Sequence, residues 1–177
     1  IHDRLAHMGG LSGTVTTAQG ALSLVTTAPS AARLGAADYS EVQWWLEVYT
    51  ALGATGVNAT VNVTYGDDTT ANLTAFALGA TPRAGRMYPL TPAAGKRIKS
   101  VNSVTLSATT GTAGNFGITA TRPLATLATY VYNKPEVHDW AQLGLPEVPN
   151  GACLQLITQC STTATGSVRG QLRIAHG

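Results

Sequence analysis

Charged side chains are scarce in this chain of 177 residues, because Asp, Glu, Lys and Arg together make up 11% of it, against about 25% in ordinary soluble proteins. The formal net charge is only +2, and no basic stripe runs along the sequence. Nucleic-acid-binding proteins carry such a stripe, because phosphate contacts supply much of their affinity. We therefore expect no nucleic-acid partner. We also expect neighbouring subunits to cover part of a surface so poor in charge.

Long apolar runs and cysteines are also lacking. No apolar run reaches the roughly 18 residues that a membrane-spanning helix needs, and residues 1–10 include His, Asp and Arg where a secretion signal would be apolar. We expect no membrane partner. Cys153 and Cys160 lie seven residues apart. On one extended strand their Cα atoms would be about 23 Å apart, which is too far for a disulfide, and their redox state stays open.

Titratable groups that could form a catalytic or metal site are few and scattered. The chain has nine Asp and Glu residues and four His residues. The adjacent His138 and Asp139 would face opposite ways on a strand, and the spacing of His2, Asp3 and His7 matches no familiar metal pattern. The sequence therefore predicts no enzyme, no cofactor and no metal.

Threonine, alanine and glycine dominate what is there, with 26, 27 and 19 residues respectively. Residues 57–65 alternate apolar and polar side chains without exception, as a half-buried strand does. Turn residues follow at Gly66, Asp67 and Asp68, and residues 71–78 alternate again, so we expect a hairpin.

Residues 39–50 predict a second strong strand, in which both faces carry large side chains. Because side chains alternate along a strand, one face receives Val42, Trp44, Leu46 and Val48, and the other receives Gln43, Trp45, Glu47 and Tyr49. The second face is half aromatic, so we expect that it is covered as well. Trp44 falls on the inner face by this pattern.

Residues 98–106 alternate less cleanly but still favour a strand over a helix. The pattern predicts that Ile98, Ser100, Asn102, Val104 and Leu106 share one side, and that Lys99, Val101, Ser103 and Thr105 share the other. Pro89 confines the short run 86–90 to a sheet edge or a strand end. Further short strands are expected at 11–18, 22–26, 116–120, 126–132, 152–159 and 167–174.

Turn signals every 8 to 15 residues and almost no helix predict an all-β fold, a jelly-roll-like sandwich or barrel of about eight to ten short antiparallel strands. An immunoglobulin-like sandwich would show the same spacing, because strand order is not visible in one sequence. Residues 1–10, which end in two glycines, have no clear period and predict an N-terminal arm. Residues 11–177 are expected to form a single β domain with a long loop excursion at 133–149.

Four phrases of the sequence resemble virion structural proteins of tailed bacteriophages: GGLSGTVTTAQ from Gly9, LEVYTALGATGVNATVNVTY from Leu46, GRMYPL from Gly85 and SVNSVTLSATTGTAGNFGITATRPL from Ser100. Among these proteins the capsid cement or decoration group is the most similar. The resemblance implies a jelly-roll-like fold, symmetric homo-oligomers such as dimers or trimers, and attachment to the major capsid protein on the outside of the virion.

We accordingly expect a structural protein that clamps capsid subunits together. The candidate contact residues come from the arm, the aromatic strand face and the long loop: Ile1, Arg4, Leu5, Met8, Trp45, Tyr49 and Trp140. Two other functions stay open at this point. One is a head-to-tail or tail component of the virion, and the other is a carbohydrate-binding or adhesin domain whose aromatic side chains stack on sugars.

Overall fold

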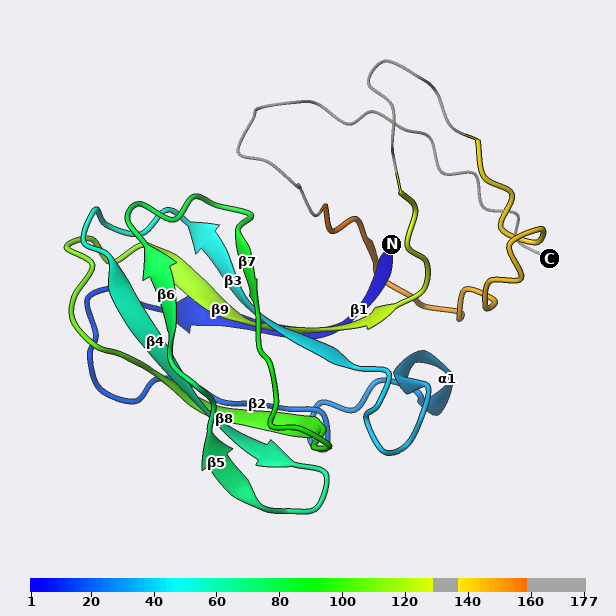
Figure 1. The fold of residues 1–177 in the computed structure, drawn as a ribbon, viewed down its shortest axis with the longest axis horizontal. Helices are drawn as coiled ribbons and strands as arrows, with labels where there is room; N and C mark the ends of the chain where they lie inside the picture. The colour runs from blue at the N-terminus through cyan, green and yellow to red at the C-terminus, as the bar shows by residue number, and fades with distance from the viewer. Residues whose placement is uncertain (129–136, 159–177) are drawn as a thin grey trace.

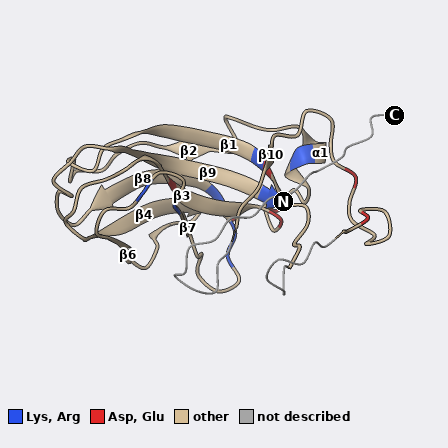
Figure 2. Cartoon of the chain, turned by 90° about the horizontal axis from the view of Figure 1, so that it is seen from above, with Lys and Arg blue, Asp and Glu red and all other residues tan. Residues whose placement is uncertain are grey.

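The structure, a computed structural model, describes residues 1–128 and 137–158. Its all-β fold consists of two antiparallel sheets packed face to face (Figures 1 and 2). The β1 sheet has the order β10-β1-β9-β3-β7, and the β8 sheet has the order β2-β8-β4-β5, with β6 also paired to β4. The elements are β1 His2–Leu11, β2 Leu22–Ser23, α1 Ala31–Leu34, β3 Gln43–Thr50, β4 Val57–Tyr65, β5 Thr70–Asn72, β6 Phe76–Gly79, β7 Met87–Pro89, β8 Ile98–Leu106, β9 Asn115–Pro123 and β10 Leu154–Gln155.

Strand connectivity is that of a jelly roll. The hydrogen-bonded pairs β1 with β9, β2 with β8, β3 with β7 and β4 with β6 are nested one inside the next. The chain also crosses from one sheet to the other between successive pairs. Such nesting is what results when one long antiparallel ribbon rolls up into two facing sheets. The predicted jelly-roll-like sandwich is confirmed.

A single core lies between the sheets and follows the alternation read from the sequence. In β4 every second residue from Val57 to Tyr65 is buried, as predicted. In β3, Trp44, Leu46 and Val48 point into the core, and the Trp44 indole N–H donates to the Ile98 carbonyl at 2.9 Å. That bond satisfies the one polar group of a buried indole.

Residues 1–10 are not an arm, which corrects the expectation from the sequence. They form most of β1, which pairs with β9 from His2 to Leu11 and with β10 at His2 and Asp3. The pairing with β9 shifts register twice, between Arg4 and Ala6 and between Met8 and Leu11. Each extra residue turns the following side chains to the other face, so the strand shows no period in the sequence.

A register shift also explains why the predicted faces of β8 are wrong. Opposite β4, the pairing passes from Ser103 directly to Val101, so Asn102 is an extra residue. Val101 therefore lies in the core, whereas Asn102 turns outward and bonds to side chains of β4. The predicted hairpin of β4 does form, but its returning half is split into β5 and β6.

The C-terminal part of the chain is less regular than predicted. Residues 126–128 lie outside any strand, and β10 covers only part of the expected strand 152–159. The rest of the strand expected at 126–132, all of 167–174 and Cys160 lie outside the described residues, whereas the Cys153 thiol is exposed. In the described part of the long loop, one turn is closed by a bond from the Leu143 N–H to the Asp139 carbonyl at 3.1 Å. No helix among the described residues is long and apolar enough to span a bilayer.

Candidate contact face on the β1 sheet

The outer face of the β1 sheet points away from the core, yet it contains large side chains that are buried. On β3 it receives Trp45, Glu47 and Tyr49, which alternate with the core residues. Trp45 is only 6% exposed and Glu47 only 7%. The prediction that this second face of the strand is covered therefore holds for Trp45 and Glu47, whereas Tyr49 is half-buried and Gln43 is exposed. Burial of a carboxylate is costly unless charge and hydrogen bonds compensate it.

Side chains from two neighbouring strands, β1 and β9, supply that compensation around Glu47. Arg4 from β1 donates from Nη2 to Glu47 Oε2 at 3.0 Å, and also to the Tyr49 hydroxyl at 3.3 Å. The Thr119 hydroxyl from β9 donates to the same Glu47 oxygen. Thr119 and the Tyr49 hydroxyl lie 3.1 Å apart and share a further hydrogen bond. The four side chains thus form one network across β1, β9 and β3.

A second group adjoins this network along the same strands. The Trp45 indole N–H donates to the Thr121 hydroxyl at 2.8 Å, and His2 Nδ1 lies 3.2 Å from that hydroxyl. The His2 and Trp45 rings meet edge to face, with their centroids 6.1 Å apart. His7 is exposed and meets the Tyr49 ring in the same manner at 6.4 Å. We call the outward residues of these two groups the Arg4 face: His2, Arg4, His7, Trp45, Glu47, Tyr49, Thr119 and Thr121.

Close approach of β1 to β9 depends on Gly117, which lies opposite Glu47 in the register. A Cβ atom at this position would lie 1.8 Å from the Met8 carbonyl oxygen. A side chain there would push β1 away from β9 and separate Arg4 from its partners on β3 and β9.

Burial changes the acidity of two groups on the Arg4 face. It raises the pKa of the Tyr49 phenol, and the nearby Glu47 charge acts in the same direction. It lowers the pKa of His2, because the charged imidazolium is harder to bury than the neutral ring. Both shifts favour neutral rings at neutral pH, so the Arg4–Glu47 pair supplies the charges at the centre of this face.

A buried ion pair anchors the start of β1 beside this face. The Asp3 carboxylate is fully buried and accepts from Arg33 Nε at 2.9 Å, from Arg33 Nη2 at 2.7 Å and from the Cys153 N–H at 2.8 Å. Arg33 Nη2 also donates to the Arg4 carbonyl at 2.8 Å. One carboxylate therefore joins β1 to α1 and to the residue before β10.

The structure brings three of the predicted contact residues together, namely Arg4, Trp45 and Tyr49. It does not place Leu5 and Met8 on this surface, because Leu5 is part of the core and Met8 packs against it. Nor does it place Ile1 there as a free end, since the Ile1 carbonyl accepts from the Leu124 and Ala125 N–H groups.

Trp140 lies apart from the Arg4 face, in the loop that follows residue 136, where its indole N–H donates to the Pro146 carbonyl at 2.8 Å. The sequence pattern placed Glu47 on this face of β3 but did not single it out as a contact residue, and it missed Thr119 and Thr121 as members of the face. The polar positions between Phe116, Ile118 and Ala120 were the available signal, because alternation places Thr119 and Thr121 together on the outward side.

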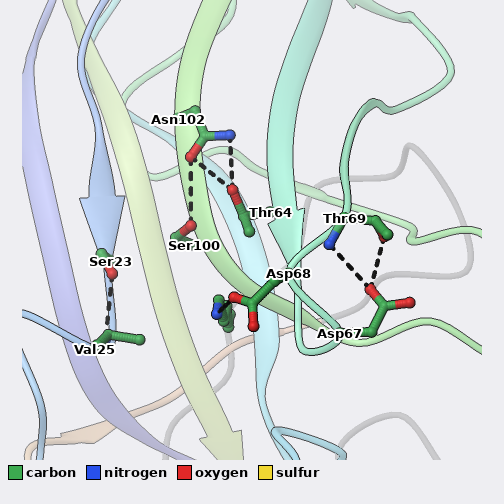
Figure 3. A network of polar contacts seen from close by, with 9 residues as sticks. Ser23, Val25, Thr64, Asp67, Asp68, Thr69, Ser100 and Asn102 are labelled. Carbon is green, nitrogen blue, oxygen red and sulfur yellow. Dashed lines mark hydrogen bonds and ion pairs between the residues drawn. The ribbon is translucent and has the colours of Figure 1, made fainter.

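The outer face of the β8 sheet differs, because its centre is polar but uncharged. Asn62 donates to Asn72 at 2.7 Å and accepts from Asn102 at 2.8 Å, so amides link β5, β4 and β8. Figure 3 shows Asn102 also bonded to Thr64 and Ser100. At its margin, Asp67 accepts from Thr69 within a tight turn, as the sequence predicts.

Metal-ligating side chains do not gather in threes anywhere in residues 1–128 and 137–158. Of the groups considered in the sequence, Asp3 is bonded to Arg33, and the Asp139 carboxylate caps its own turn by accepting from the Ala141 and Gln142 N–H groups. Comparison of the chain with protein-family models, curated proteins and solved structures gave no match.

Proposed function

We propose that this chain is a structural virion protein that binds the outside of a capsid shell and stabilises it. The observation that carries the proposal is the Arg4 face, where a largely desolvated ion pair lies on a rigid sheet beside the half-buried Tyr49 ring and the exposed His7 ring. Interface centres are rich in aromatic residues and arginine, and sites on strands are held more firmly than sites on loops. The proposed partner, the capsid shell, is the one that the resemblance of four segments to phage virion proteins implies.

The chain would stabilise the shell through the total surface area that it buries against capsid subunits, rather than through a few strong contacts. A standard interface buries about 1,600 Å² in total, and repetition over symmetric copies multiplies its effect. Homo-oligomers, such as dimers or trimers, would place several Arg4 faces on the shell at once. The low charge of the chain suits subunits whose surfaces are covered in the assembly.

The first experiment is sedimentation of native source material through a density gradient, followed by mass spectrometry of the fractions. A copy number comparable with that of the shell protein supports capsid decoration. A few copies per particle would move the chain to the neck or tail of the virion. Recovery in the light fractions alone would refute a virion role and would make glycan binding, tested with Trp140→Ala, the next candidate.

A second experiment tests the Arg4 face itself, by co-sedimentation of the purified chain with particles stripped of it. His7→Glu adds a charge to an exposed position of the face, and Asn58→Glu adds the same charge to an exposed position on the other sheet. We expect the first variant to lose particle binding and the second to keep it. Equal binding by both variants would remove the Arg4 face from the proposal.

A further inference from the structure

Three arginines in the described residues differ from all the other cationic side chains there. Of the eight Lys and Arg side chains in that part of the chain, Arg4, Arg33, Lys96, Lys99 and Arg122 form ion pairs with carboxylates. Arg83, Arg86 and Arg97 form none, and all three are exposed. Because carboxylates neutralise the other five cationic side chains, the unpaired positive charge of the described Lys and Arg residues is confined to these three arginines.

The three unpaired arginines lie on two hollows at opposite ends of the edge strand β7. One hollow, of about 290 Å³, is lined by Trp44, Trp45, Pro89, Leu90, Pro92 and Arg97 together with neighbouring residues of β3 and of the loop after β7. The other, of about 430 Å³, is lined by Leu78, Pro82, Arg83, Arg86 and Tyr88 together with the loop between β6 and β7. Each hollow thus combines apolar walls with at least one guanidinium.

Two of these guanidinium groups are held in position and still keep donors for a ligand. Arg86 lies over the Tyr88 ring, 5.2 Å from its centroid, and Arg97 Nη1 donates to the Lys96 carbonyl at 3.0 Å. Asp38 interacts with Arg97 only through longer-range electrostatics, and its carboxylate accepts from Ser40 at 2.6 Å. A guanidinium has five N–H donors, and its planar fork matches a carboxylate.

We propose that this surface, the β7 edge, docks an extended acidic segment of a partner protein. The proposal rests on the proposed function, because it names the chemistry of the segment that the capsid partner would present. Arg86 and Leu90 bracket β7, and four extended residues span about 13 Å, so a short strand-like segment reaches both hollows. Its carboxylates would pair with the unpaired arginines, and its apolar side chains would fill the hollows.

Charge complementarity favours an acidic protein segment over a nucleic acid. Single-stranded nucleic acid binds by stacking bases on exposed aromatic rings. Trp44, Trp45 and Tyr88 are 3%, 6% and 8% exposed, so they line the hollows without offering a ring face. Three separated guanidinium groups are also few for a phosphate backbone, which recruits a continuous basic track.

The test measures fluorescence anisotropy of a labelled synthetic peptide of alternating Glu and Ala, with a Gln-for-Glu peptide and an oligothymidine strand as comparison probes. The test variant is Arg83→Gln/Arg86→Gln/Arg97→Gln. The matched control Lys96→Gln/Lys99→Gln/Arg122→Gln removes the same charge from cations that form ion pairs. Circular dichroism establishes that each variant is folded.

We expect the acidic peptide to bind the unmodified chain in a salt-sensitive manner, to lose about tenfold or more in affinity in the test variant, and to change little in the control. Absence of binding to the acidic peptide, or equal losses in both variants, would overturn the proposal. Tighter binding of oligothymidine that is lost in the test variant would overturn it in favour of a nucleic acid. Particle binding that survives in the test variant would refute this inference alone, whereas failure of the unmodified chain to bind particles would refute the proposed function.

Discussion

Asp3 and Arg33 form a two-point ion pair, in which Arg33 Nε and Nη2 donate to the two oxygens of one fully buried carboxylate. Asp3 lies in β1 and Arg33 in α1, thirty residues later in the chain. This contact joins the start of β1 to α1, in addition to the backbone pairing of His2 and Asp3 with β9 and β10.

Asp3→Asn is expected to destabilise the fold by about 3 kcal/mol, because it leaves the largely buried Arg33 charge without its counter-ion. Urea denaturation followed by circular dichroism measures the loss. Glu41→Gln is the matched control, because Glu41 is largely exposed in its pair with Arg122, and it should cost less than about 1 kcal/mol. Similar losses in both variants would contradict the importance of the buried pair.

Arg4→Met and Glu47→Gln should each destabilise the fold by about 2 kcal/mol, because each leaves a partly desolvated partner unsatisfied. The double variant should lose less free energy of unfolding than the two single variants together, since each single variant already removes the Arg4–Glu47 contact. A double-mutant cycle in urea measures the difference, which we expect to be about 1 kcal/mol or more. Additive losses would show that the two side chains are not energetically coupled.

Stability should also depend on Asp67 at acid pH. Its ion pair with Lys96, helped by Thr69, lowers the pKa of the Asp67 carboxyl from 3.8 to about 2. Because the folded value lies below the ordinary one, the pair stabilises the fold above about pH 4, and this contribution is lost as the pH falls towards 2. Carboxyl-carbon NMR titration should give a higher midpoint for Asp67 in Lys96→Met. In Lys99→Met, which removes the neighbouring pair with Asp68, the midpoint should not change.

Gly117→Ala should destabilise the fold by about 2 kcal/mol or more, because the new methyl group would collide with the Met8 carbonyl oxygen. Gly56→Ala is the control, since a Cβ atom there meets nothing closer than 3.6 Å. Thermal unfolding of the two variants makes the comparison. A Gly117→Ala chain as stable as Gly56→Ala would show that β1 can move away from β9 without cost.

The sequence by itself determined the class of the fold and several of its strands. Strict alternation from Val57 to Tyr65 predicted β4 with the bounds that the structure has, and the same rule separated Trp44 from Trp45 in β3. Alternation of side chains is a local property of the extended backbone. A single sequence therefore shows it wherever a strand pairs with its neighbours without a register shift. Pro89 likewise confined its short run to a sheet edge or a strand end, because proline lacks the N–H that an interior strand needs, and in the structure β7 is an edge strand that ends at Pro89.

Only the tertiary structure decided where residues 1–10 lie and how the Arg4 face is built. Register shifts in β1 and β8 break the alternation, and they arise from pairing with strands far away in the chain. Arg4, Glu47 and Thr119 are separated by more than forty residues from one another, so no local pattern could join them. Strand order depends on which strands bury apolar surface against one another and on how buried charges such as Asp3 and Glu47 find partners, and both depend on residues that are far apart in the chain.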